Sequence, residues 1–229
     1  MYTINNVFDM VYLVNLKREP QKFNTMKKKL DNLDIKFQHF EAIDGSKIQD
    51  CKLLRFGNKG AVGYKMSMMS IIHDAKNNNY SKILILEDDL YFSDDFNNNF
   101  NDCYTKTMKL NENWKLLYLG ASNRTGKNHI NYNILNKNKE NLHQIGKKVI
   151  AGSYGICYSS SIFDEVLKCE FDNKPFDDIL SDVVCDSNYI CIPYLLYANV
   201  NKPSTTVDNN NKNQEFYNKL NYIDPTKYS

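Results

Sequence analysis

The chain lacks three features that would narrow its class at once: a long hydrophobic run, a strong charge of one sign and a paired-cysteine motif. None of its apolar stretches approaches the roughly 20 residues that a bilayer requires, so no membrane span is expected. Its 29 Lys and Arg residues nearly cancel its 27 Asp and Glu residues, and no nucleic-acid partner is expected. Its six cysteines form no CxxC pair, which argues against a structural zinc site.

Several common catalytic signatures are also missing. The sequence contains no GxGxxG turn, no Walker loop and no GxSxG elbow, and its four histidines form no HxxxH pair. The N-terminal segment has no basic stretch before its apolar run and no small-residue cleavage site, so it does not resemble a signal peptide. A chain of 229 residues buries enough surface to fold without disulfides, and reduced thiols are expected. Together these features predict a cytoplasmic location.

The composition that remains is that of an ordinary globular protein. Hydrophobic residues make up 42% of the chain and charged residues 24%. The length fits one domain, which we place at residues 1–205. Residues 206–229 are rich in Asn and Lys with scattered aromatics, and we expect them to form a C-terminal tail.

The hydrophobic pattern predicts an open α/β sheet. The apolar run 10–14 is typical of a strand buried on both faces, a helical pattern follows from Pro20, and residues 35–40 alternate as a second strand. This β-α-β opening is the unit of a parallel sheet. Further strands are expected at 82–86, 116–120, 150–158, 190–193 and 195–200, and helices at 61–77, 93–110, 161–167 and within 175–188. The polar segment 122–148 is expected to form loops with a short hairpin.

The strongest chemical signal is the triplet Glu87-Asp88-Asp89, which directly follows an aliphatic strand. Ligands of open α/β sheets bind at the carboxyl ends of strands. Three adjacent carboxylates repel one another, and a cation such as Mg²⁺ or Mn²⁺ would relieve that repulsion and bridge to phosphate oxygens. The alternative is a solvated acidic turn that favours the N-terminus of the next helix.

Two weaker signals are expected near the same edge of the sheet. The turn Asn15-Leu16-Lys17-Arg18 leaves the first strand, and its arginine suits a phosphate or a base, although a basic surface turn is the simpler interpretation. Pro175-Phe176-Asp177-Asp178 offers late carboxylates that suit a general base, although Asp pairs beside Pro are common in turns.

Taken in order, these segments resemble glycosyltransferase family 25, which includes lipopolysaccharide galactosyltransferases and collagen hydroxylysine galactosyltransferases. The resemblance covers about residues 11–205. Each motif is short, and the specificity lies in the ordered set. Its pieces are the NLxR turn at 15–18, A-x-D-G at 42–45, a Gly-rich helix start at 60–67, LEDD at 86–89, Leu119-Gly120, the segment 152–158, Pro175-Phe176-Asp177 and Pro203-Ser204.

The resemblance implies a fold and an activity. The fold is an α/β fold of GT-A type, with a Rossmann-like, mostly parallel central sheet flanked by helices. The activity is an inverting transfer of galactose or glucose from a UDP-sugar donor to a hydroxyl on a protein-linked or glycan acceptor. A divalent cation is implied as cofactor, Mn²⁺ or alternatively Mg²⁺.

The resemblance also implies roles for individual residues. Asp89 is expected to bind the metal with support from Glu87. Asp177 holds the P-x-D position and is expected to be the catalytic base, with Asp178 as the second choice. The residues expected to bind the nucleotide sugar are Asn15, Leu16, Arg18, Ala42, Asp44, Ser67, Glu87 and Asp88.

Three positions depart from the family pattern. A Ser-His pair is replaced by Ser67-Met68, a Cys by Tyr64, and the second basic residue of the opening turn is Lys22 instead of Arg. These departures keep open a second interpretation, a catalytically degenerate module that binds a UDP-sugar or a glycan. A nucleotidyltransferase shares the sheet and the carboxylates and is a third interpretation, but the basic Gly-rich loop usual near the start of such chains is absent here.

Overall fold

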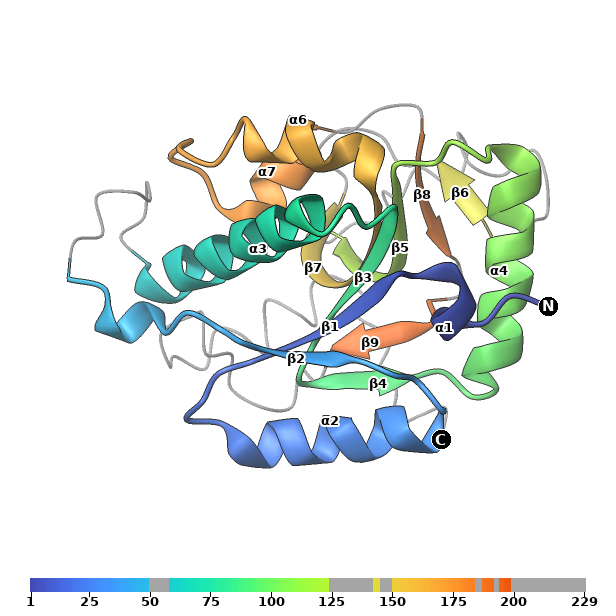
Figure 1. Cartoon of the computed structure of the whole chain (residues 1–229), viewed down its shortest axis with the longest axis horizontal. Coiled ribbons are helices and arrows are strands. Elements are labelled where there is room, and N and C mark those ends of the chain that lie inside the picture. Colours follow the sequence, from blue (N-terminus) through green and yellow to red (C-terminus); the bar gives the residue numbers. More distant parts are fainter. Residues whose placement is uncertain (50–57, 124–141, 145–149, 184–186, 192–193, 199–229) are drawn as a thin grey trace.

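The computed structural model describes residues 1–49, 58–123, 142–144, 150–183, 187–191 and 194–198. Figure 1 shows a main sheet with helices on both faces and a small second sheet formed by β4 and β9. The strands are β1 (Met10–Asn15), β2 (Gln38–Glu41), β3 (Lys82–Glu87), β4 (Leu90–Phe92), β5 (Leu116–Asn123), β6 (Leu142–Gln144), β7 (Ile150–Ser159), β8 (Asn188–Cys191) and β9 (Leu196–Ala198). The helices are α1 (Ile4–Val7), α2 (Pro20–Asn32), η1 (Gly45–Lys47), α3 (Lys59–Asn77), α4 (Phe96–Leu110), η2 (Ser160–Ile162), α6 (Phe163–Leu167) and α7 (Phe176–Asp182).

The main sheet has seven strands in the order β2-β1-β3-β7-β5-β8-β6. The pairs β1–β2, β1–β3 and β5–β8 are parallel, whereas β7 runs antiparallel between β3 and β5, and β6 runs antiparallel to β8. Five of the seven strands therefore point in the same direction. The prediction of a mostly parallel, Rossmann-like α/β sheet that opens with a β-α-β unit is confirmed.

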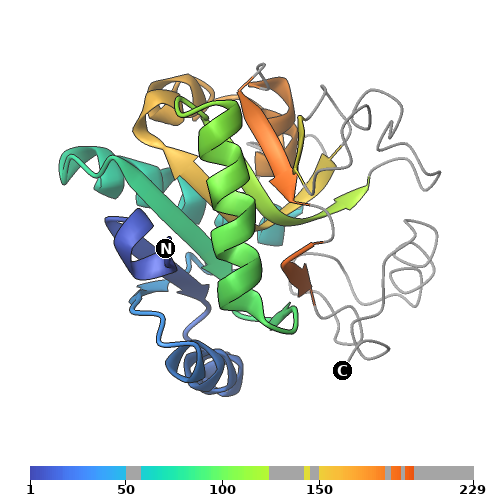
Figure 2. The same ribbon diagram turned by 90° about the vertical axis from the view of Figure 1, so that its right-hand side faces the viewer.

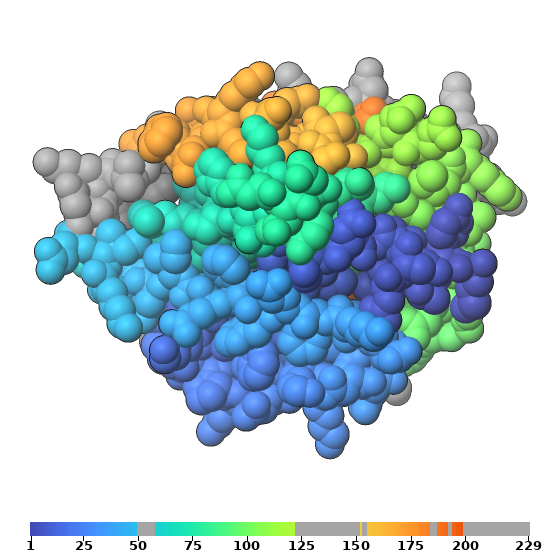
Figure 3. Space-filling model, viewed as in Figure 1, coloured from blue at the N-terminus to red at the C-terminus, as the bar shows by residue number. Residues whose placement is uncertain are grey.

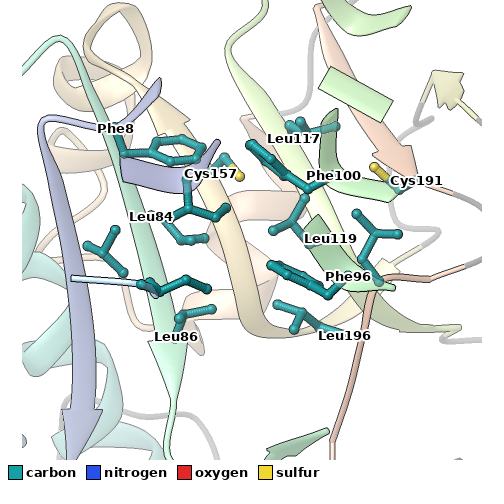
Figure 4. Packing of buried hydrophobic residues seen from close by; sticks show 14 of the residues in the cluster. Phe8, Leu84, Leu86, Phe96, Phe100, Leu117, Leu119, Cys157, Cys191 and Leu196 are labelled. Atoms are coloured by element: carbon teal, nitrogen blue, oxygen red, sulfur yellow. The ribbon is translucent and has the colours of Figure 1, made fainter. Parts of the chain in front are cut away.

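Two hydrophobic clusters cover the two faces of this sheet. One lies beneath α1, α2 and α4 and includes Leu84 and Leu86 of β3, and Figure 4 shows Phe96 and Phe100 of α4 beside Leu117 and Leu119 of β5. The other lies beneath α3, α6 and α7 and takes the intervening strand residues such as Ile85. Figure 2 shows α4 lying across its face of the sheet. The alternation along β3 follows from the pleat of a strand, which points successive side chains to opposite faces.

A disulfide bond fastens α4 to the sheet. Cys103 of α4 and Cys191 of β8 are bonded, with their Cα atoms 6.3 Å apart, and both residues are buried. The prediction that the thiols are reduced is therefore wrong for this pair. Of the other cysteines in the described residues, Cys157 and Cys169 are free. The expected cytoplasmic location rested partly on reduced thiols and loses that support.

A second, two-stranded sheet follows the acidic triplet. β4 pairs antiparallel with β9, and the Ser93 amide donates to the Leu195 carbonyl oxygen at 2.9 Å. The helix that was predicted to start with Ser93 as its cap begins instead at Phe96, after Asp95, because the chain first completes β4 and its turn.

No helix in the part of the chain that the structure describes is long and apolar enough to cross a membrane. The predicted tail at 206–229, the Pro203-Ser204 motif and most of the predicted loop segment 122–148 lie outside the described residues.

Candidate active site

The ends of β1 and β3 lie side by side at the carboxyl edge of the sheet. Val14 is opposite Glu87 in their parallel register, so Asn15 and Asp88 meet one residue further on. The Asn15 side chain is only 2% exposed, and its amide donates to the Asp88 carboxylate and, at 3.0 Å, to the Glu19 carbonyl oxygen. Both hydrogens of the amide are used within the protein. Asn15 therefore links the exit turn of β1 to the acidic triplet.

The acidic triplet is divided between the two sides of the sheet. Ile85 belongs to the cluster beneath α3 and Leu86 to the cluster beneath α4. Continuing this alternation, Glu87 lies on the α3 side, where Tyr64 is hydrogen-bonded to it, and Asp88 lies on the α2 side. Glu87 and Asp88 therefore lie on opposite sides of the sheet, which is compatible with the prediction that Asp89 and Glu87, and not Asp88, bind the metal.

Negative charge is concentrated on the α3 side. Burial, the charge of Asp89 and the weaker effects of Asp177 and Asp88 raise the pKa of Glu87 well above its ordinary value, while the hydrogen bond with Tyr64 opposes the shift. A bound cation would relieve the same repulsion by favouring the ionised carboxylates. This side of the triplet thus has the charge distribution of a cation site.

The α2 side is partly neutralised by the protein itself. Burial raises the pKa of Asp88, and the hydrogen bond with Asn15 and the positive charge of Lys22 oppose that shift. Lys22 is in the first turn of α2. One of the three departures from the family pattern therefore acts electrostatically on the middle acid of the triplet.

Asp177 lies across the sheet edge from the triplet. It is in the first turn of α7, and the Gly152 backbone amide donates to its Oδ2 at 3.1 Å. Its charge contributes to the raised pKa of Glu87 and, after burial, to the raised pKa of Tyr118. Asp178 follows it in the same turn. The structure thus brings the predicted base into the electrostatic surroundings of the predicted metal ligands.

Arg18 and Asp44 form an ion pair at the other end of this edge. The Arg18 guanidinium bonds the Asp44 carboxylate, which also accepts from the Ser46 amide at 3.0 Å and the Ser46 hydroxyl at 2.7 Å. The bond with Arg18, followed by those with Ser46, lowers the pKa of Asp44 from 3.8 to about 2. The Arg18 side chain keeps 43% of its surface exposed. Arg18 is therefore both anchored and accessible.

The remaining predicted binding residues contribute through the backbone or from within the fold. The Leu16 carbonyl oxygen accepts from the Glu19 amide at 2.8 Å and closes the turn after β1. The Ala42 amide donates to the Asn15 carbonyl oxygen at 2.9 Å. Ser67 is 0% exposed, so its hydroxyl faces the protein and not the solvent. Direct contact of these three residues with a ligand stays a prediction.

Three residues at this edge were not among the predicted site residues. Tyr64 bonds Glu87, Tyr118 is buried near the charge of Asp177, and Gly152 supplies the amide that holds Asp177. Tyr64 already had a signal, since it replaces a Cys of the family pattern. Tyr118 was indistinguishable from its apolar neighbours in the strand, and the positive φ of Gly152, 81°, emerges only from the structure.

The donor atoms on the α3 side suit a hard cation. Glu87 and Asp89 offer carboxylate oxygens, which Mg²⁺ and Mn²⁺ prefer. Among the described residues, no three His, Cys, Asp or Glu side chains are grouped so that they could hold a metal. A magnesium-like ion is commonly bound by one or two carboxylates together with substrate phosphates and water. The pair fits such a shared site and not a cage built from protein ligands alone.

Comparison with known proteins gives a consistent assignment. A model of glycosyltransferase family 25, described as an LPS biosynthesis protein family, matches residues 8–151. The mouse "Inactive glycosyltransferase 25 family member 3" is 26% identical over 129 residues, covering 49% of this chain and 22% of that protein. The human "Procollagen galactosyltransferase 2" is 25% identical over 136 residues, covering 49% and 21%. A Drosophila melanogaster "Glycosyltransferase 25 family member" is 28% identical over 107 residues, covering 40% and 18%.

The matched segments span about a fifth of the length of these relatives, 18–22%. The family match contains the exit of β1, the A-x-D-G motif at 42–45, α3 and the complete acidic triplet. The motifs and the fold thus agree with the match that covers more than half of the residues, and the chain belongs to glycosyltransferase family 25.

Proposed function

We propose that this chain is a metal-dependent, inverting glycosyltransferase that moves galactose or glucose from a UDP-sugar to an acceptor hydroxyl. The observation that supports this proposal most directly is the divided triplet. Glu87 and Asp89 concentrate negative charge on one side of the sheet edge, Asp177 faces them electrostatically, and Arg18 offers positive charge at the same edge. Such an edge suits a ligand that carries phosphates and a bound cation.

The donor would lie along the carboxyl edge between Arg18 and the triplet. The guanidinium of Arg18 suits a phosphate oxygen because it presents several N–H donors in one plane. Glu87 and Asp89 would hold Mn²⁺ or Mg²⁺. When bound, the ion would supply positive charge to the diphosphate leaving group.

Asp177 would act as the base. It would remove the proton from the acceptor hydroxyl while that oxygen attacks the anomeric carbon from the face opposite the leaving group. The bond between the anomeric carbon and the phosphate oxygen breaks, and UDP departs with the electron pair. The Gly152 amide donates to Oδ2 of Asp177 at 3.1 Å, which holds this carboxylate in place in the first turn of α7. Arg18 would stabilise the charge that develops on UDP.

The names of the relatives support a narrower acceptor class. Three of them, from mouse, human and Xenopus laevis, are called procollagen galactosyltransferases. We therefore propose galactose as the first donor sugar to test and a protein-linked hydroxyl as the first acceptor, with glucose and glycan acceptors as the next choices.

The first experiment is a calorimetric titration of the chain with UDP, with and without Mn²⁺. We expect binding that depends on the metal and is lost in Asp89→Asn. Asp94→Asn, which changes an exposed acid after β4, is the matched control and should bind as the wild type does. Equal binding with and without Mn²⁺ would contradict the metal assignment.

The base is tested separately by turnover. Asp177→Asn should bind UDP normally and lose roughly 10²- to 10⁴-fold in turnover, the range that a positioned general base supplies. Asp178→Asn is the neighbouring control and should retain most activity. Loss of UDP binding in Asp177→Asn would assign this residue to the donor site instead.

The second candidate is a module that binds a UDP-sugar without transferring it. A mouse relative is named as inactive, and the Ser-His pair is incomplete here. Met68, which occupies the position of the missing histidine, is 0% exposed and lies in the core beneath α3. That position therefore faces the core in this chain, which weakens the argument from the missing histidine. UDP-sugar binding without hydrolysis or transfer would favour the second candidate.

A further inference from the structure

The Ser67 hydroxyl is saturated by the protein backbone. It donates to the Gly63 carbonyl oxygen at 2.7 Å and accepts from the Ile43 amide at 2.8 Å, and the residue is fully buried. A serine hydroxyl has one hydrogen, so it has no donor left for a ligand. Any effect of Ser67 on a ligand must pass through the groups that it holds.

The segment that Ser67 holds lies directly on α3. A Cβ atom on Gly63 would come within 2.4 Å of the Ile43 carbonyl oxygen, and one on Gly45 within 1.8 Å of the Lys59 carbonyl oxygen. Figure 3 shows the light-blue residues before position 50 against the teal surface of α3. The two backbones touch because both glycines lack side chains. The Ser67 bond to Ile43 fixes where this segment lies along the helix.

Asp44 connects the position of Ile43 to the edge of the sheet. Asp44 follows Ile43, and its carboxylate bonds the guanidinium of Arg18. Arg18 keeps 43% of its side-chain surface exposed. A guanidinium has five N–H donors in a planar fork, so one carboxylate does not exhaust it. A chain of contacts thus connects the buried Ser67 hydroxyl of α3, through Ile43 and Asp44, to Arg18. The Arg18 guanidinium can still bind a second anion.

We propose that Ser67 is a positioning residue of the donor site, which acts through the Ile43 amide and Asp44 to orient Arg18 toward the donor phosphates. The role of Arg18 in this proposal rests on the function proposed above. In this proposal the buried Ser67 acts without contacting the donor or the acceptor, in place of the direct contact that the sequence predicted.

Ser70 provides a matched control on the same helix. Its hydroxyl also bonds the carbonyl oxygen four residues back, that of Met66, at 2.8 Å, but Ser70 is exposed. Ser67→Ala should weaken UDP binding about tenfold, because a buried backbone amide loses its acceptor and the segment shifts. Ser70→Ala should change UDP affinity less than about twofold, since only a local helix bond is lost. Equal affinities of Ser67→Ala and the wild type would overturn the proposal.

A double-mutant cycle with Arg18→Ala separates positioning from general loosening. If Ser67 acts through Arg18, Ser67→Ala should cause no further loss of UDP affinity in the Arg18→Ala background. The same fold-loss in both backgrounds would overturn the proposal. If Ser67→Ala does not fold, Asp44→Asn can replace it in the double-mutant cycle. This variant removes the carboxylate that bonds Arg18 and leaves α3 unchanged.

A second readout needs no donor. The rate at which phenylglyoxal modifies Arg18, followed by mass spectrometry, reports how well Asp44 holds the guanidinium. Ser67→Ala should raise that rate severalfold and Ser70→Ala should leave it unchanged. Identical rates in wild type and Ser67→Ala would overturn the proposal. Failure of the wild type to bind UDP would overturn the proposed function, while the modification rates would still decide whether Ser67 holds Arg18.

Discussion

The two faces of the sheet are built from different chemistry. Beneath α4, the rings of Phe96, Phe100, Tyr104 and Trp114 form a continuous row of ring contacts. The Cys103–Cys191 disulfide ties the same helix to β8. This face is dominated by apolar surface, and its contacts are insensitive to charge.

The face beneath α3 contains more buried polar groups. The Tyr12 hydroxyl donates to Asp74, the amine of Lys65 donates to the Asp172 carbonyl oxygen, and Ser67 bonds two backbone groups. Buried polar groups fix geometry because they lose free energy when their partners move. Both faces bury a hydrophobic cluster, and we infer that the disulfide-linked α4 face contributes mainly to stability, whereas the α3 face determines where the charged groups of the sheet edge lie.

The largest effect is expected from the α4 face. Replacing both Cys103 and Cys191 by Ser removes a link across 88 residues, and the unfolding free energy should fall by about 4–5 kcal/mol on the chain-entropy account. Urea unfolding with and without reductant measures the loss. Cys169→Ser, which removes a free thiol, is the control. The opposite result, a variant that keeps its unfolding free energy but loses UDP affinity, would contradict the assignment of stability to the α4 face and of ligand geometry to the α3 face.

Replacing Gly63 of α3 by Ala should lower stability, although Gly→Ala substitutions inside helices usually raise it. Gly→Ala inside a helix normally stabilises by up to about 1 kcal/mol. Gly63→Ala should instead destabilise by about 2 kcal/mol and weaken UDP binding, since the new methyl group would collide with the Ile43 carbonyl oxygen. Thermal unfolding together with calorimetry checks both effects. If Gly63→Ala were more stable than the wild type, the backbone around Ile43 would have to move away from α3 at little cost in free energy.

Asn15 is buried at the carboxyl edge of the sheet and bonds Asp88, so its replacement should affect both stability and UDP binding. Asn15→Ala removes the amide that bonds Asp88 and the Glu19 carbonyl oxygen, and we expect a loss of about 1–2 kcal/mol in unfolding free energy. UDP affinity should fall as well, because the triplet loses its link to β1. Asn97→Ala, which alters an exposed residue of α4, serves as control. Unchanged UDP affinity in Asn15→Ala would separate Asp88 from the donor site.

The smallest effect is a dependence of stability on pH at the edge of the α3 face. Asp44 has a lowered pKa of about 2 in the folded chain against an ordinary 3.8. Its stabilising contribution is complete above the ordinary pKa and is lost as the pH falls from about 4 to about 2. Exposed ion pairs contribute less than about 1 kcal/mol. Subtracting the unfolding free energies of Asp44→Asn from those of wild type should reveal this step, and a flat difference would contradict it.

Local patterns were sufficient for much of the fold. Pro20 at the start of α2 and the apolar run of β1 predicted the opening β-α-β unit, which is present. The direction of β7 could not be predicted, because antiparallel placement between β3 and β5 depends on distant pairing. α1 and β4, with four and three residues, are too short to give a periodic signal.

The sequence named the acids of the candidate site but not their supporting contacts. Glu87 and Asp177 were named from their positions in motifs, and the structure places them within each other's electrostatic influence, while their roles stay predictions. Strand alternation alone places Glu87 and Asp88 on opposite sides of the sheet. Which helix covers each side could be learned only from the structure. The disulfide could not be inferred, since Cys103 and Cys191 are far apart in sequence and neither belongs to a paired motif.

The pairing of β4 with β9 has a consequence for the order in which the protein is made. β4 begins directly after the triplet, yet its partner strand ends only at Ala198. A ribosome that has produced the whole family-matched region, residues 8–151, has not yet made that partner strand or Asp177. Contacts so distant in sequence require a costly loop closure and are slow to form. The nascent chain therefore cannot complete the β4–β9 sheet or bring Asp177 to the acidic edge until these late residues have been made.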